Sequence, residues 1–67
     1  MLELVINGEP RVFPAPLSVA QLVEVLALGG KRIAIEKNGE IVPRSRHADT
    51  PLASGDRLEI VVAVGGG

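Results

Sequence analysis

Hydrophobic and polar positions alternate along the first residues of the chain. In Leu2–Ile6 the even-numbered positions are apolar and fall on one side, which predicts a half-buried strand. Asn7-Gly8 follows, and this pair predicts a tight turn because both residues tolerate positive φ. Glu9–Phe13 is then expected to return as an antiparallel strand. Pro10 has no backbone N–H, so this strand is expected at an edge of the sheet.

One segment has helical periodicity. Within Val19–Leu28, apolar residues recur at the first, fourth, fifth and eighth positions, as on one face of a helix. Ser18 precedes the segment and Gln21 stands three residues later, the pattern of a capping box. Gly29-Gly30 is expected to end the helix by adopting a left-handed C-terminal cap.

The second half of the chain reads as short strands and turns. Arg32–Lys37 and Glu40–Val42 are expected to form strands around a tight turn at Asn38-Gly39, and Pro43 should end the second of them. Residues 44–53 are polar and should form a loop with one helical turn.

Two apolar features complete the pattern. Leu52 is expected to anchor the preceding loop to the core. Arg57–Val64 is the longest alternating segment, with its even-numbered positions apolar throughout, and it predicts the last strand.

The order of these elements predicts an α+β fold. The first and last strands are the most apolar, so they should be central, adjacent and parallel, with the helix over one face. That arrangement is the β-grasp, or ubiquitin-like, fold: a mixed four- or five-stranded sheet with one main helix. The expected organisation is one domain over residues 1–64 and a flexible glycine tail over 65–67.

Composition narrows the class of function. The chain has 67 residues, seven basic and eight acidic, one aromatic residue and no cysteine. The near-neutral charge argues against nucleic-acid binding, which favours a basic face and stacking rings. No apolar run approaches the roughly 18 residues of a membrane span, and the N-terminus lacks a basic leader, so a cytoplasmic protein is expected. So small a domain has little room for a substrate pocket, which favours a carrier or binding module over an enzyme.

The terminal Gly65-Gly66-Gly67 carries the strongest chemical signal. Glycine has no Cβ, so this segment can pass through a channel too narrow for side chains. A terminal carboxylate has a pKa of about 3.3–3.7 and is ionised at neutral pH. It can therefore attack the α-phosphate of ATP and form an acyl adenylate. The competing interpretation is a frayed chain end without a role.

A second candidate is the face of the sheet that points away from the helix. Alternation places Glu3 and Val5 of the first strand on this face, where they should neighbour residues of the last strand, giving an apolar spot rimmed with charge. Such a spot can be a docking surface, although scattered surface aliphatics are an equally good interpretation. The expected members are Val5, Glu59, Val61, Ala63 and Val64.

The remaining candidates are weaker. Arg44, in the stretch Ile41-Val42-Pro43-Arg44, could meet phosphate or an acidic partner, or could simply be solvated. His47 is the only histidine and there is no cysteine, so no metal site is expected. It is interpreted as a surface or half-buried loop residue.

Taken together, these motifs resemble those of the ThiS family of sulfur carrier proteins over essentially the whole chain. The resemblance rests on Asn7-Gly8, residues 38–44 (NGEIVPR), residues 52–59 (LASGDRLE) and the terminal residues 64–67 (VGGG). It implies a role in forming the thiazole moiety of thiamine, in which the carrier is a co-substrate and not a catalyst.

The resemblance also implies partners. A ThiF-like adenylyltransferase would use ATP and magnesium to adenylate Gly67, and the carrier itself would bind no cofactor. A sulfur relay from a cysteine desulfurase would convert the adenylate to a thiocarboxylate, whose sulfur passes to a ThiG-like thiazole synthase. Members commonly end in two glycines, which correspond to Gly66 and Gly67, so Gly65 is additional.

Two alternatives remain open at this point. The small subunit of molybdopterin synthase would use the same tail chemistry for the molybdenum cofactor, although the short chain and the IVPR stretch speak against it. A non-covalent interaction module would use no tail chemistry at all.

Overall fold

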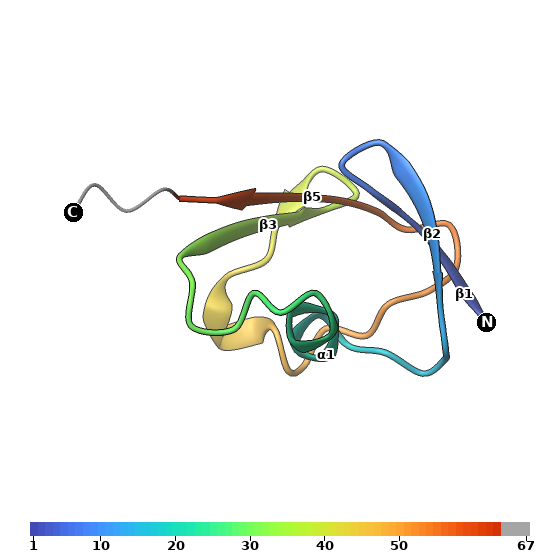
Figure 1. Ribbon diagram of the computed structural model, residues 1–67, viewed down its shortest axis with the longest axis horizontal. Coiled ribbons are helices and arrows are strands. Elements are labelled where there is room, and N and C mark those ends of the chain that lie inside the picture. The colour runs from blue at the N-terminus through green and yellow to red at the C-terminus, as the bar shows by residue number, and fades with distance from the viewer. Residues whose placement is uncertain (64–67) are drawn as a thin grey trace.

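A computed structural model describes residues 1–63 of the chain; Val64 and the three terminal glycines lie outside the described residues. Figure 1 shows one helix packed beneath a twisted sheet. The elements in chain order are β1 (Leu2–Ile6), β2 (Glu9–Phe13), α1 (Val19–Val25), β3 (Ile33–Lys37), β4 (Glu40–Ile41), the 3₁₀ turn η1 (Arg44–Arg46) and β5 (Arg57–Val62). No helix among residues 1–63 is long and apolar enough to cross a bilayer.

The five strands form one sheet in the order β2-β1-β5-β3-β4. β1 and β5 run parallel and side by side, whereas β2 and β3 pair antiparallel to them on either side. This mixed sheet with a single α-helix confirms the predicted β-grasp architecture. β5, the strand that leads into the glycine tail, occupies the centre of the sheet.

The core lies between α1 and the inner face of the sheet. The even-numbered residues of β1 and β5 point inward, as the alternation predicts, and the apolar side of α1 meets them. The most deeply buried side chains are Leu4, Val19, Leu22, Ile35 and Leu58. All are aliphatic, and the single aromatic residue, Phe13, is buried in the same core cluster.

Pro10 lies on the edge strand β2, as predicted, and it costs the sheet no hydrogen bond. Its partner Val5 donates its N–H to the carbonyl oxygen of Asp56, 3.0 Å away on the opposite side of β1. The pair Val5–Pro10 is therefore of the non-hydrogen-bonded kind, in which the missing N–H of proline would face solvent.

The helix begins as predicted but ends early. Ser18 and Gln21 form the capping box in both directions. α1 stops at Val25, and the left-handed residue of its C-terminal cap is Ala27, with φ +58°, so the prediction that Gly29-Gly30 supplies this cap was wrong. The N–H groups of Ala27 and Leu28 donate to Glu24 and Val23, the two bonds of a Schellman motif.

The segment after β4 contains the expected helical turn, η1, and Leu52 is buried as predicted. His47, in contrast, is buried, with 9 % of its surface exposed, so its assignment to a surface or half-buried position was wrong. Its Nε2 lies 3.1 Å from the carbonyl oxygen of Val42 and must carry a proton to donate to it. The carbonyl of His47 accepts from Ala20 in the first turn of α1, so this residue ties the loop to both β4 and the helix.

Candidate functional site

The root of the glycine tail is held by β3. Val62, the last residue of β5, stands opposite Ile33, and the N–H of Ala63 donates to the carbonyl oxygen of Arg32 at 2.8 Å. This bond continues the antiparallel ladder one residue past β5. The point at which the chain leaves the sheet is therefore fixed by main-chain contacts, whereas Gly65, Gly66 and Gly67 lie outside the described residues.

The outer face of the sheet is arranged differently from the prediction. Glu59 and Val61 lie opposite Glu36 and Ala34 of β3. They do not neighbour Glu3 and Val5, because β1 pairs with β5 only at Val5–Arg57 and Ile6–Leu58. In this register β1 lies beside the start of β5, and the end of β5 pairs with β3.

An apolar patch nevertheless exists beside the end of β5. Val61 is 63 % exposed and Ala34 is exposed beside it, while Ile41 on β4 is 76 % exposed and stands opposite Glu36. We call Ala34, Ile41 and Val61, with the flanking Glu36 and Glu59, the outer patch. It retains Val61 and Glu59 of the predicted surface, and Ala63 directly follows β5. Val5 stands apart beside Arg57, and Val64 lies outside the described residues.

Ile41 and Ala34 were missed as members of this surface. Their positions follow from the register of the β3–β5 and β3–β4 pairs, which the sequence pattern does not determine. Sequence alternation alone says which face a residue occupies, but not which neighbour it meets.

Arg44 lies in η1, beneath the sheet in Figure 1, so it does not join the outer patch. Its Nη2 donates to the carbonyl oxygen of Lys31 at 3.1 Å, and Lys31 precedes the residue that holds Ala63. Lys31, Arg32 and Arg44 are all exposed, and we call them the tail-root basic cluster. The ion pair found among residues 1–63 is Lys37–Asp56, at 4.0 Å and outside this cluster.

Asp56 anchors the start of β5. One carboxylate oxygen accepts from the N–H of Ala53 at 2.8 Å and the other accepts from the side-chain amide of Asn38 at 3.0 Å. Burial acts to raise the pKa of Asp56, but these bonds and the nearby Lys37 ammonium outweigh burial and hold the pKa below its usual value. The network joins the β3–β4 turn to the beginning of the strand that carries the tail.

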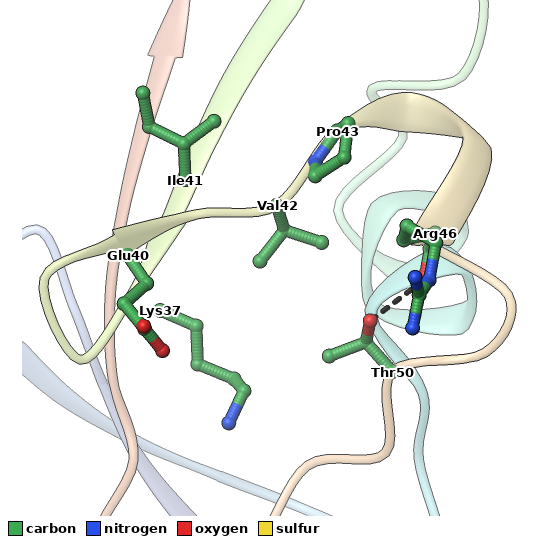
Figure 2. Close-up of a pocket in the computed structure, with 7 residues that line it drawn as sticks. All are labelled: Lys37, Glu40, Ile41, Val42, Pro43, Arg46 and Thr50. Carbon is green, nitrogen blue, oxygen red and sulfur yellow. Dashed lines mark hydrogen bonds between the residues drawn. The ribbon is translucent and has the colours of Figure 1, made fainter.

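A shallow hollow of about 300 Å³ opens between β4, η1 and Thr50. Figure 2 shows Val42 at its centre, with Lys37 and Glu40 on one side and Arg46 and Thr50 on the other. The Thr50 hydroxyl donates to the carbonyl of Arg46 at 2.6 Å, so it is occupied by a local bond. Within residues 1–63, no group of three or more histidine, aspartate or glutamate side chains is placed to hold a metal ion.

The chain is similar to known proteins over nearly its full length. The family whose sequence model matches is the ThiS family, over residues 4–67. The crystal structure of thiamine biosynthesis protein ThiS from Geobacter metallireducens superimposes with a TM-score of 0.83 at 29 % identity, covering 98 % of this chain and 100 % of that one.

Two curated relatives add to this. A thiazole synthase of Paramagnetospirillum magneticum is 46 % identical over 66 residues, which are 98 % of this chain but 20 % of that protein. The uncharacterised protein ycf40 of Porphyra purpurea is 38 % identical over 98 % of this chain and 93 % of its own length. The chain thus spans about a fifth of the thiazole synthase that it matches.

Proposed function

The chain belongs to the ThiS family, and on that premise we propose that it is a sulfur carrier in thiamine biosynthesis, with Gly67 as the residue that carries the sulfur. The observation that carries the proposal is the family match, which extends through the terminal glycines. The structural similarity to a thiamine biosynthesis protein supports it across the whole domain.

The proposed chemistry takes place on the carboxylate of Gly67. A carboxylate oxygen attacks the α-phosphate of ATP in a ThiF-like adenylyltransferase, with its magnesium, and pyrophosphate leaves. The terminal sulfur of a persulfide supplied by a cysteine desulfurase relay then attacks the carbonyl carbon, and AMP leaves. A thiol reduces the S–S bond of the resulting acyl disulfide, which frees the thiocarboxylate and leaves a disulfide. The chain contains no cysteine, so the sulfur must come from outside it.

In this cycle the domain positions the tail and the partners supply the catalysis. Gly66 and Gly65 keep the tail slim enough to enter an active site. The bond from Ala63 to Arg32 fixes where the tail begins, and the outer patch beside it offers Val61 and Glu59 for docking. This assigns the chain the role of a co-substrate.

We propose a thiazole synthase of the ThiG type as the acceptor of the sulfur. The similarity of this chain to one-fifth of a protein named thiazole synthase supports the assignment, because a carrier and its acceptor joined in one chain would work on each other. In the proposed cycle, the thiocarboxylate on Gly67 is the donor to that enzyme.

Intact-mass measurement tests the proposal directly. The chain is purified, and its mass is measured first to verify that it ends at Gly67. It is then incubated with the adenylyltransferase, ATP, magnesium and a sulfur donor. The expected product has one oxygen replaced by sulfur and becomes reactive toward a thiol-specific alkylating reagent. A chain lacking Gly67 is the matched control and should fold normally but remain unmodified. Unchanged mass of the complete chain, under conditions that convert a known carrier, would refute the proposal.

Genetic rescue separates the two pathways that use this tail chemistry. The gene for this chain should restore growth to a thiamine-requiring strain that lacks its own carrier. Rescue of a strain without molybdenum cofactor, and not of the thiamine-requiring strain, would instead assign the chain to molybdopterin synthase.

A further inference from the structure

The central strand β5 uses its two edges differently. Its odd-numbered residues bond to β3: the carbonyl of Arg57 accepts from Asn38 at 2.7 Å, and the N–H of Ala63 donates to Arg32 at 2.8 Å. Because hydrogen-bonding groups alternate along a strand, the N–H and C=O of the even-numbered residues point toward the β1 side.

On the side that faces β1, the main-chain groups of β5 have hydrogen-bond partners as far as Ile60. The main chain of β1 bonds to the first half of β5 and ends with the N–H of Asn7, which donates to Leu58 at 2.9 Å. The side chain of Asn7 then takes the place of a strand: its Oδ1 accepts from the N–H of Ile60 at 2.8 Å and its Nδ2 donates to the C=O of Ile60 at 3.1 Å. The Asn7 side chain thus pairs with the main-chain N–H and C=O of Ile60, the next even-numbered residue after Leu58.

Val62 is the next even-numbered residue, and it lies past the reach of Asn7. In Figure 1 the C-terminal half of β5 extends beyond the β1–β2 hairpin. The alternation therefore directs the N–H and C=O of Val62 to an edge that has no strand among residues 1–63. Val61 and Val62 are 63 % and 39 % exposed on the two faces of this edge.

We propose that this free edge at Val62 receives an extended segment of the adenylyltransferase, which adds a strand beside β5 as the tail enters the active site. Strand addition supplies main-chain hydrogen bonds, while pockets for alternate side chains supply selectivity. The exposed valines on both faces call for a segment with apolar side chains. Within residues 1–63 the free edge offers the N–H and C=O of Val62, which suffice for the two hydrogen bonds of a β-bridge to the added segment.

The edge is well placed for this purpose because it belongs to the strand that leads to Gly67. A segment bound there would align the chain that follows and would pack beside Val61, at the border of the outer patch. The inference rests on the proposed function, since it names how that enzyme holds the tail.

The test compares Val62→Pro with Val62→Ala. Proline removes the N–H that faces the free edge and leaves the bonds to β3, whereas alanine removes most of the side chain and keeps the N–H. Calorimetric titration with the adenylyltransferase should show that the proline variant binds about fivefold more weakly than the alanine variant, the effect of one lost hydrogen bond. Equal affinities of two folded variants would overturn the proposal.

Amide hydrogen exchange on the unmodified chain provides a measurement that needs no variant. The Val62 amide should exchange rapidly in the free carrier, in contrast to Val61 and Ala63, and should become protected in the complex. A Val62 amide that exchanges equally fast in the complex contradicts strand addition. Conversion of the unmodified chain to the thiocarboxylate is measured in parallel. Conversion without protection of the Val62 amide would contradict strand addition alone, whereas absence of conversion would contradict the proposed function.

Discussion

Glu36 on β3 and Glu59 on β5 stand directly opposite each other across the antiparallel pair. Like charges in this position destabilise a sheet, and no cation is paired with either carboxylate among residues 1–63. Their neighbours Val61 and Ile41 are exposed apolar residues. A local conflict of this kind is expected where a surface is shaped for a partner and not for stability.

Replacing Glu36 by glutamine should therefore stabilise the free domain while weakening its complex. Removing the repulsion should raise the free energy of unfolding by about 0.2–1 kcal/mol, measured by urea denaturation. Affinity for the adenylyltransferase should fall, because the outer patch loses one of its two charges. Glu9→Gln on the edge strand β2 is the control and should change neither quantity measurably. A Glu36 variant that is more stable and binds equally well would show that the glutamate pair takes no part in docking.

The C-terminal cap of α1 offers a separate test of stability. Ala27 adopts φ +58°, a conformation that costs an L-residue with a Cβ roughly 1–2 kcal/mol. Ala27→Gly should relieve this strain and, after the greater flexibility of glycine in the unfolded chain is included, raise stability by about 0.5–1 kcal/mol. The matched Ala20→Gly change, in the first turn of α1, should lower stability by about 0.5–1 kcal/mol. Thermal denaturation of the three chains gives the order, and an Ala27→Gly chain that melts below the original would contradict the cap assignment.

The same residue shows where sequence reasoning reached its limit. The pair Gly29-Gly30 is a normal helix stop, and nothing in the sequence marks Ala27 as left-handed. The helix ends earlier because Leu26 and Leu28 both pack against the core, which requires the chain to reverse between them. Tertiary packing therefore overrides the local preference of alanine.

The fold was predictable because the spacing of apolar residues along the chain identifies the strands and the helix. Alternation identified β1 and β5, and their apolar character placed them side by side in the centre, as the structure has them. Register was not predictable, so the expected contact of Glu3 and Val5 with the end of β5 was wrong. His47 was misplaced for a similar reason: its burial depends on the carbonyl of Val42, whose position follows from the path of the chain after β4.

The Asp56 network predicts how stability depends on pH. The pKa of Asp56 is lowered in the folded chain, so its contribution to stability is fully present above the pKa of the unfolded chain, near 3.8, and is lost as pH falls through the lower folded value. The Asp56→Asn chain should be less stable than the original chain at neutral pH. On acidification its free energy of unfolding should fall by less than that of the original chain. Urea denaturation at pH 7 and at stepwise lower pH measures both effects. Parallel curves for the two chains below pH 4 would contradict a lowered pKa at this residue.

The tail-root basic cluster predicts how strongly salt affects recognition. Arg32 and Arg44 flank the point where the chain leaves the sheet, and exposed cations there should steer the carrier toward an acidic rim around the partner's active site. The double change Arg32→Gln, Arg44→Gln removes both charges and retains amide donors, including one for the Lys31 carbonyl. The association rate with the adenylyltransferase should fall severalfold at low salt and by less as salt screens the charges. Arg11→Gln, on the opposite edge of the sheet beside Phe13, is the control and should leave the association rate unchanged. Stopped-flow measurement across a salt series distinguishes them, and a double variant with the unaltered salt dependence would show that the cluster plays no part in docking.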